Sequence, residues 1–448
     1  MSYISNTLKD LEYMLKEIGI SSVEELFADI PEEIHLQTDL DIPAAMPEHK
    51  LIAYFRELAG KNKAFHDLPA FLGAGSYFHC VPVVVKDILS RAEFYTAYTP
   101  YQPEVSQGTL QAIFEFQTYI CQLTEMEVAN ASLYDGATAL AEAILMSHRV
   151  NNRTEVLLSN SIHPEYRKVV GTYLKNMGMK IIEIPFAEDG QLDITHLKNI
   201  INKETCAVAL QNPNFFGVLE DYQKIFAALD DKKIMKVVTI TEPLSLALLN
   251  PPGRFGADIV VGDAQSFGLH PAFGGPTVGF MGTKTEHVRR MPGRLAGMAN
   301  DNEGNRGFVL TLSTREQHIR REKATSNICT NQALCALAVT VYLSLLGPAG
   351  LKKIAHVNLQ RAHYLQEKLC DHPQIQLLFT SPFFNEFAIR INGSLEQIIH
   401  KLFEDGIIAG LPLKKFYPQF DDCLLVNVTE LHNKEILDLY IENVIKEL

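Results

Sequence analysis

The sequence predicts an α/β fold with a mainly parallel sheet that is covered by helices on both faces. Two observations lead to this prediction. Short apolar segments rich in Val and Ile recur between residues 156 and 281, and segments with apolar residues at helical spacing separate several of them. Alternating strands and helices are typical of parallel strands joined by crossover helices. The expected strands are 156–158, 180–184, 206–210, 236–240, 259–261 and 278–281, and the expected helices between them are 165–175, 194–201 and 222–229.

Composition and charge describe the class of protein and exclude some partners. A chain of 448 residues is too long for one ordinary domain, and 47% hydrophobic with 21% charged residues is typical of a globular protein. The net charge of −13 argues against binding to nucleic acid or to an anionic membrane, because both attract basic surfaces. The seven cysteines are scattered and include no CxxC pair, which favours a reducing cytoplasm over a disulfide framework or a metal site.

Three regions are expected along the chain: an N-terminal helical arm (1–65), a large α/β domain (66–330) and a smaller C-terminal α+β domain (331–448). Ser21 or Ser22 is placed to cap a second helix of the arm. The first helix of the arm is predicted by apolar residues at helical spacing, namely Leu8, Leu11, Leu15 and Ile18.

The C-terminal region opens with an apolar run and continues with mixed elements. The run 333–346 is too short to span a bilayer and is expected to be a buried helix. Strands are expected at 384–391 and 423–428, and a helix at 395–405.

Residues 71–108 are dense in Gly, Pro and Tyr and have little periodicity, so they are expected to form a long loop. Long loops inside compact chains are usually functional. An alternative is that the tyrosines pack against an interface with their hydroxyls hydrogen-bonded. The residues of this loop that we expect to line a pocket or complete a site are Tyr95, Tyr98, Thr99, Tyr101, Gln102 and Ser106.

A turn made of Asp135, Gly136, Ala137 and Thr138 precedes a helix-like run. Free N–H groups and the positive end of a helix dipole suit a phosphate at such a turn. Ordinary capping by Asp135 or Thr138 is the alternative.

Ligands of parallel α/β sheets lie at the carboxyl ends of the strands. Four such ends are expected, and the last of them leads into the turn Leu269-His270-Pro271-Ala272-Phe273-Gly274-Gly275. The residues at these ends are Ser159 and His163, Asn212 and Asn214, Thr241 and Glu242, and Asp263 to His270.

Four long segments resemble the glycine cleavage system P-protein, and more narrowly its first subunit in organisms that divide it between two chains. The resemblance covers about residue 65 to the C-terminus. The segments are FLGAGSYFHCVPVVV, FYTAYTPYQPEVSQGTLQAIFEFQTYICQLTEMEVANASLYDGATALAEA, NPPGRFGADIVVGDAQSFGLHPAFGGPTVGF and REKATSNICTNQAL.

The resemblance implies an aminotransferase-like fold (PLP-dependent transferase fold type I) with a seven-stranded sheet. It also implies the activity of the family, which decarboxylates glycine with pyridoxal phosphate and passes the aminomethyl group to the lipoyl arm of H-protein. In divided systems the Schiff-base lysine belongs to subunit 2, in a Leu-His-Lys-Thr-Phe type segment. Here the flanks Leu269-His270 and Phe273 are kept, but Pro271 stands where the lysine would be, and proline has no amine.

Two further residues are interpreted through the resemblance. Fold relatives pair an Asp with the protonated pyridine nitrogen, and Glu242 stands at the matching position before Pro243. A solvated or capping glutamate is the alternative. His163, which precedes Pro164, is placed to stack on a flat ring or contact substrate, or to serve as a structural residue at a helix start.

The leading hypothesis is a cofactor-free subunit 1 of a cytoplasmic, heterotetrameric glycine decarboxylase that has no catalytic residue of its own. Its expected partners are subunit 2, which carries pyridoxal phosphate, and lipoylated H-protein, with glycine as the substrate of the complex. No nucleic acid, membrane or metal is expected. One alternative is a pyridoxal phosphate enzyme that uses another lysine, for example Lys284 or Lys86, and a second is a non-catalytic scaffold or regulatory protein on the same fold.

Overall fold

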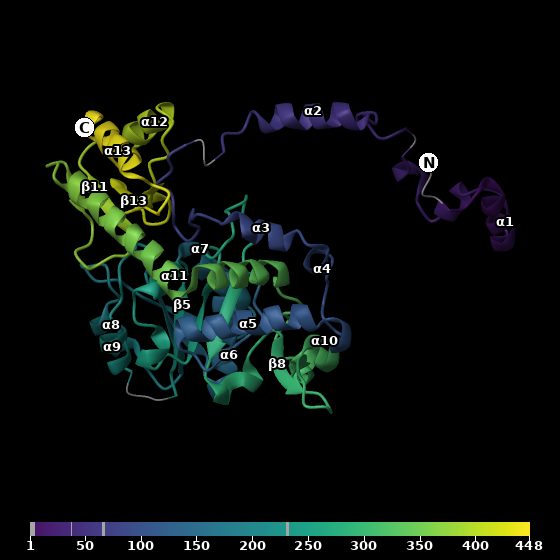
Figure 1. The fold of residues 1–448 in the computed structure, drawn as a ribbon, viewed down its shortest axis with the longest axis horizontal. Helices are drawn as coiled ribbons and strands as arrows, with labels where there is room; N and C mark the ends of the chain where they lie inside the picture. The colour runs from purple at the N-terminus through teal and green to yellow at the C-terminus, as the bar shows by residue number, and fades with distance from the viewer. Residues whose placement is uncertain (1–4, 37, 65–67, 230–232) are drawn as a thin grey trace. The chain divides into compact units, whose positions relative to one another are not determined.

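The computed structural model describes residues 5–36, 38–64, 68–229 and 233–448 (Figure 1). The chain divides into two units, Met1–Lys63 and Ala64–Leu448. The boundary expected between residues 65 and 66 lies outside the described residues.

The first unit contains two α-helices, α1 (Leu8–Ile18) and α2 (Glu48–Ala59), and two short 3-10 helices, η1 (Glu24–Phe27) and η2 (Glu32–Ile34). The predicted helix α1 begins at a capping box between Thr7 and Asp10. The prediction of a second helix after Ser21 or Ser22 was wrong, since only η1 forms there and Ser21 instead donates hydrogen bonds to the Glu25 carboxylate. Pro31 disfavours helical backbone at the residue before it, which limits the length of any helix in this stretch.

The second unit is built on a seven-stranded sheet with the order β1-β7-β6-β5-β4-β2-β3. Strands β2 to β6 run parallel, whereas β7 is antiparallel to β6 and β1 is antiparallel to β7. The six predicted strands are all present, and only the two-residue β1 was missed. The bounds are β1 Val128–Ala129, β2 Glu155–Ser159, β3 Lys180–Ile184, β4 Thr205–Gln211, β5 Met235–Ile240, β6 Ile259–Asp263 and β7 Gly279–Thr283.

Helices cover both faces of this sheet. Neighbouring residues of one strand belong to different core clusters, as Val237 and Val238 do, because successive side chains point to opposite faces. One face packs against α5 (Gln107–Thr124), α8 (Ile194–Ile200), α9 (Tyr222–Ala227) and α11 (Ala333–Cys370), and the other against α6 (Gly136–Asn151) and α7 (Pro164–Leu174). The predicted two-faced α/β architecture is therefore confirmed.

Helix α11 is longer than the predicted run 333–346. It resumes after Gly347, whose backbone is not helical (φ 58°, ψ −178°), and Pro348 follows the kink. Among the described residues it is the one helix long and apolar enough to cross a membrane, and half of its most apolar window is buried inside the protein. Buried core helices meet the same criteria of length and composition. Its residues pack in the core of the sheet domain, as the buried Tyr342 does.

The C-terminal part carries a four-stranded antiparallel sheet with the order β10-β11-β13-β12. The expected strands and helix of this part are present as β11, β13 and α12. The bounds are β10 Ile375–Leu377, β11 Glu386–Ile391, β12 Leu411–Pro412, β13 Cys423–Asn427, α12 Leu395–Glu404 and α13 Lys434–Lys446.

The stretch 71–108, expected to be a loop, contains helices. They are α3 (Val83–Leu89), α4 (Ala92–Tyr95) and the 3-10 turn η4 (Pro103–Val105). The β-branched run at the start of α3 has low helix propensity, which hid the helix from the sequence pattern. The other elements of the unit are a hairpin of β8 (Leu295–Asn300) and β9 (Arg306–Thr311), α10 (Gln317–Arg320), and the 3-10 helices η5 Pro243–Ala247, η6 Pro252–Phe255, η7 Thr285–Arg290, η8 Ser313–Arg315, η9 Arg321–Lys323 and η10 Leu413–Lys415.

Candidate functional site

The carboxyl ends of the parallel strands bring polar residues to one edge of the sheet. Gln211 ends β4, and its side chain accepts a hydrogen bond from the His163 N–H (2.8 Å) and donates one to the Thr241 hydroxyl (3.1 Å). Asp263 ends β6 and accepts a hydrogen bond from the N–H of Gly136 at the start of α6 (3.1 Å). Strand ends and a helix start thus meet where the fold class places ligands.

The segment 71–80, which we call the strap, is bonded to this edge at three points. The Ala74 carbonyl lies 2.8 Å from His163 Nε2. Tyr77 is bonded through both backbone groups to the Gln265 side chain, with its N–H donating (2.9 Å) and its carbonyl accepting (3.0 Å). His79 Nε2 lies 2.9 Å from the Glu242 carboxylate. The strap therefore uses polar groups that follow β2, β5 and β6.

His79 is a buried imidazole between two carboxylates. Its Nε2 faces Glu242 at the end of β5, and its Nδ1 faces Glu430, which follows β13, at 2.8 Å. Its side chain is 1% exposed. Burial alone lowers the pKa of His79, but Glu242 and then Glu430 outweigh burial and raise it to about 10. The ring is thus a cation at neutral pH that links the large sheet to the C-terminal sheet.

Glu386 on β11 also binds the strap, through both oxygens of its carboxyl group. Its carboxyl group accepts hydrogen bonds from the Ala74 N–H (2.6 Å) and the Tyr77 hydroxyl (3.0 Å). Burial, with a smaller contribution from the charge of Glu242, raises the pKa of Glu386 to about 8. The group is therefore mostly protonated at pH 7, so the cluster carries fewer buried negative charges than its carboxyl groups would suggest.

The glycine turn at the start of α6 is capped within the chain. The Asp135 carboxylate accepts from the Thr138 N–H (2.7 Å), and the Gly136 N–H donates to Asp263. Burial raises the pKa of Asp263 to about 6. A Cβ at Gly136 would lie 2.3 Å from the Tyr166 hydroxyl, so only glycine fits. The capping alternative describes the observed contacts, and phosphate binding here stays a prediction.

The structural interpretation of His163 accounts for its contacts. Its Nδ1 accepts from the Glu165 N–H (3.2 Å) and so caps α7, while its Nε2 donates to the Ala74 carbonyl. Its ring centroid lies 4.9 Å from that of Tyr166 and 5.1 Å from that of Phe215. The residue is thus a capping histidine enclosed by aromatic rings and by the strap.

Glu242 is buried, which excludes the solvated alternative for this residue. Its carboxylate accepts from the Leu244 N–H (3.1 Å) and caps η5, in addition to pairing with His79. The capping alternative is therefore part of its role.

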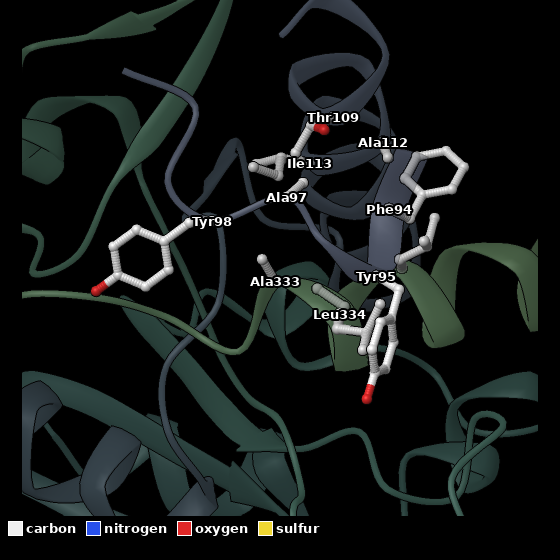
Figure 2. Close-up of a pocket in the computed structure, with 11 residues that line it drawn as sticks. Phe94, Tyr95, Ala97, Tyr98, Thr109, Ala112, Ile113, Ala333 and Leu334 are labelled. Atoms are coloured by element: carbon white, nitrogen blue, oxygen red, sulfur yellow. The ribbon is translucent and has the colours of Figure 1, made fainter. Parts of the chain in front are cut away.

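The tyrosine-rich loop (residues 95–106) is exposed, in contrast to the strap. The exposed fractions are 69% for Tyr95, 83% for Tyr98 and 58% for Tyr101. Tyr95 and Tyr98 line a small cavity of about 50 Å³ with apolar residues of α5 and α11, and Figure 2 shows the Tyr98 ring extending away from the other lining residues. The Arg294 guanidinium lies 5.8 Å from the centroid of the Tyr101 ring.

The remaining candidate residues lie apart from the strap contacts. Gln102 is exposed, and Thr99 and Ser106 are half-buried in the tyrosine-rich loop. His270 is exposed in the turn that follows β6, and Pro271 is half-buried there. The structure therefore brings His163 and Glu242 to the strap, but not His270.

Neither alternative lysine lies at this edge. Lys284 follows the antiparallel β7 and pairs with Asp258, which immediately precedes β6, so it stands at the amino ends of the parallel strands. Lys86 is exposed on α3. In the part of the chain that the structure describes, no three His, Cys, Asp or Glu side chains are grouped as metal ligands.

Sequence reasoning missed the residues with the densest buried contacts. Glu386 and Glu430 are more than 300 positions from the strap residues that they bind, so no local pattern connects them. One signal is present in the sequence, because FLGAGSYFHC, which contains His79, lies in the stretch 71–108 that is expected to be functional.

Comparisons with known proteins agree with the resemblance of the sequence. The family model described as glycine cleavage system P-protein matches residues 1–444. The chain is 50% identical over 440 residues to the probable glycine dehydrogenase (decarboxylating) subunit 1 of Anoxybacillus flavithermus, covering 98% of both chains. It is 51% identical over 438 residues to the protein of the same description from Desulfitobacterium hafniense, again covering 98% of both.

Solved structures show the fold. A crystal structure of glycine decarboxylase (P-protein) of the glycine cleavage system, in inhibitor-bound form, has a TM-score of 0.89 at 44% identity and covers 100% of both chains. A Burkholderia pseudomallei sphingosine-1-phosphate lyase has a TM-score of 0.67 at 16% identity, with 93% of both chains covered, which concerns the fold alone. The predicted PLP-dependent transferase fold type I is confirmed.

Proposed function

Because the chain belongs to the glycine cleavage system P-protein family, in the branch described as glycine dehydrogenase (decarboxylating) subunit 1, we propose that it is the cofactor-free subunit of a heteromeric enzyme. Its partner, subunit 2, carries pyridoxal phosphate. The complex decarboxylates glycine and passes the aminomethyl group to the lipoyl arm of H-protein in the cytoplasm.

The residues present do not fit the cofactor, and this observation carries the proposal. A Schiff base needs a lysine amine, whereas Pro271 stands in the turn after β6. The carboxylate at the ring-nitrogen position, Glu242, is already bonded to His79. The amide of Gly136 in the phosphate-like turn is bonded to Asp263. Pyridoxal phosphate would supply an electron sink for the decarboxylation, and in our proposal that chemistry belongs to subunit 2.

This chain supplies a surface that completes the partner's site. The tyrosine-rich loop presents aromatic rings with hydroxyl groups to solvent, a combination that suits both apolar packing and hydrogen bonding to another chain. Its exposure supports an interface, because large exposed aromatic side chains clustered on one loop mark interaction sites.

Exposure of this loop also agrees with a second candidate, a non-catalytic scaffold or regulatory protein on the same fold. The two candidates differ in what the partner does alone. Removing a scaffold leaves the activity of subunit 2 unchanged, whereas removing a site-completing subunit abolishes that activity.

The test is glycine–bicarbonate exchange with lipoylated H-protein, measured for this chain alone, for subunit 2 alone and for both together. The proposal expects exchange only when both chains are present. Full exchange by subunit 2 alone would favour the scaffold, and exchange by this chain alone would place the lysine elsewhere in this sequence.

A further inference from the structure

We infer that residues 74–79 of the strap are a built-in occupant of the sheet edge at which a pyridoxal phosphate ring would lie. Replacing Pro271 by lysine therefore does not give this chain a cofactor site. The inference rests on the proposed function only in taking pyridoxal phosphate as the ligand concerned.

The strap uses the groups that a bound ring would need. His163, the candidate for stacking on a flat ring, donates to the Ala74 carbonyl at 2.8 Å. Glu242, the candidate for the ring nitrogen, pairs with His79 at 2.9 Å. Gln265, two residues past β6, is bonded to both backbone groups of Tyr77. A ring that entered would have to break these contacts or leave their buried polar groups unpaired.

His79 replaces the positive charge of a protonated ring. Its imidazolium faces Glu242 and Glu430. A protonated pyridine nitrogen that paired with Glu242 would therefore have to displace the His79 cation from this carboxylate. The Asn385 amide also approaches the Glu242 carboxylate, at 3.4 Å. Two titratable groups on other elements face this cluster. Burial, and then the charges of Glu430 and Glu242, raise the pKa of Tyr342 on α11, and burial with a smaller contribution from Glu242 raises the pKa of Glu386 on β11.

The fit is also steric, because the strap lies directly on His163. Gly75 has a left-handed backbone (φ +92°), and a Cβ there would lie 2.7 Å from His163 Cδ2. The strap is also bonded to Glu386 through the Ala74 N–H and the Tyr77 hydroxyl. At Gly75 the backbone lies so close to the His163 ring that a single added carbon would clash, so a planar ring could stack on His163 there only if the strap moved.

The test introduces lysine into the full-length chain as Pro271→Lys, with Pro271→Ala as the control for loss of the proline. Each protein is mixed with one equivalent of pyridoxal phosphate, reduced with borohydride and mapped by mass spectrometry. We expect position 271 to be labelled no more than about twofold above the exposed Lys86, which reports non-specific surface reaction. Selective, near-stoichiometric labelling at position 271 would overturn the inference.

Hydrogen exchange of the wild-type chain gives a readout that needs no variant. The Ala74 and Tyr77 amides, which donate to Glu386 and Gln265, are expected to exchange at least ~100-fold more slowly than amides of the exposed turn 272–274. Addition of pyridoxal phosphate should leave them unchanged. Fast exchange, or a change in their protection by pyridoxal phosphate, would contradict a seated strap.

These readouts are independent of the exchange assay for the proposed function. Loss of glycine–bicarbonate exchange in the assembled complex bears on the partnership of the chains, whereas labelling at position 271 and strap protection bear only on whether the edge is filled.

Discussion

The strap (71–80) and the tyrosine-rich loop (95–106) belong to one stretch of similar composition, yet they differ in burial. In the strap, Tyr77 is 3% exposed and its hydroxyl is bonded to Glu386. In the loop, Tyr98 is 83% exposed. The same residue type is therefore buried and hydrogen-bonded in one place and exposed in the other.

The difference teaches that similar composition can serve two structural roles. In the strap, buried polar groups bond to each other, as His79 does with its two carboxylates. In the tyrosine-rich loop, large aromatic rings stay exposed, which is the property that supports the proposed interface.

The largest effect is expected at His79. His79→Ala leaves Glu242 and Glu430 buried without their cation, which should cost roughly 3–5 kcal/mol of unfolding free energy. Denaturant unfolding measures the loss. His400→Ala is the matched control, because His400 faces Glu404 on the exposed face of α12 and should change stability by less than ~0.5 kcal/mol. Equal losses of unfolding free energy for the two substitutions would show that the buried cluster contributes no more to stability than the exposed pair does.

Gly75 and Gly274 have nearly equal φ angles, so comparing them separates the effect of crowding from that of a left-handed backbone. Gly75→Ala in the strap should cost about 2–3 kcal/mol, since the new methyl meets His163 at 2.7 Å in a left-handed backbone. Gly274→Ala has φ +94° but no atom within 4 Å, so only the backbone strain of about 1 kcal/mol is expected. Thermal unfolding of both variants compares them, and a Gly75 variant no less stable than the Gly274 variant would show that the strap is not pressed on His163.

Glu386 should make stability depend on pH in a defined window. Its folded pKa of about 8 lies above the ordinary 4.5, so the folded chain holds the proton more tightly. The stabilisation is complete below about pH 4.5 and is lost as pH rises through about 8, with a slope of up to ~1.4 kcal/mol per pH unit from this group. Glu386→Gln should flatten that part of the curve of unfolding free energy against pH. An unchanged slope would mean that the carboxyl group is already ionised in the folded chain.

The smallest effect on the chain itself is expected in the tyrosine-rich loop. Tyr95→Ala and Tyr98→Ala should change the stability of the isolated chain by less than ~0.5 kcal/mol, because both rings are mostly exposed. In the complex each should lower exchange activity or affinity for subunit 2 by roughly 10-fold, equivalent to ~1.4 kcal/mol. Phe403→Ala on α12 is an exposed aromatic control that should leave both unchanged. If the tyrosine variants bind subunit 2 and catalyse glycine–bicarbonate exchange as well as the control does, the loop is not part of the interface.

Much of the fold was predictable, because strand and helix periods are local signals. Strand β3 was predicted with its observed ends, and the other strands of the large sheet within one or two residues, apart from the two-residue β1. The missed helix α3 shows the limit of such signals, since it forms despite its β-branched start, with Val85 buried and the helix in contact with α11.

The site was less predictable, because its contacts are long-range. His163 and Glu242 follow strand ends as expected, whereas the interpretation of Pro271 as the position of a lost lysine stays a prediction. The partners of the strap were missed, since pairing His79 with Glu430 joins segments 351 positions apart. Topology, and not spacing, brings such groups together.

The most direct test of the account is to reduce the assembled complex with borohydride and to locate pyridoxal phosphate on its two chains by peptide mapping. The account predicts one labelled lysine on subunit 2 and no label on this chain above the level of exposed surface lysines. A stoichiometric label on this chain, at Lys284, Lys86 or any other lysine, would contradict it.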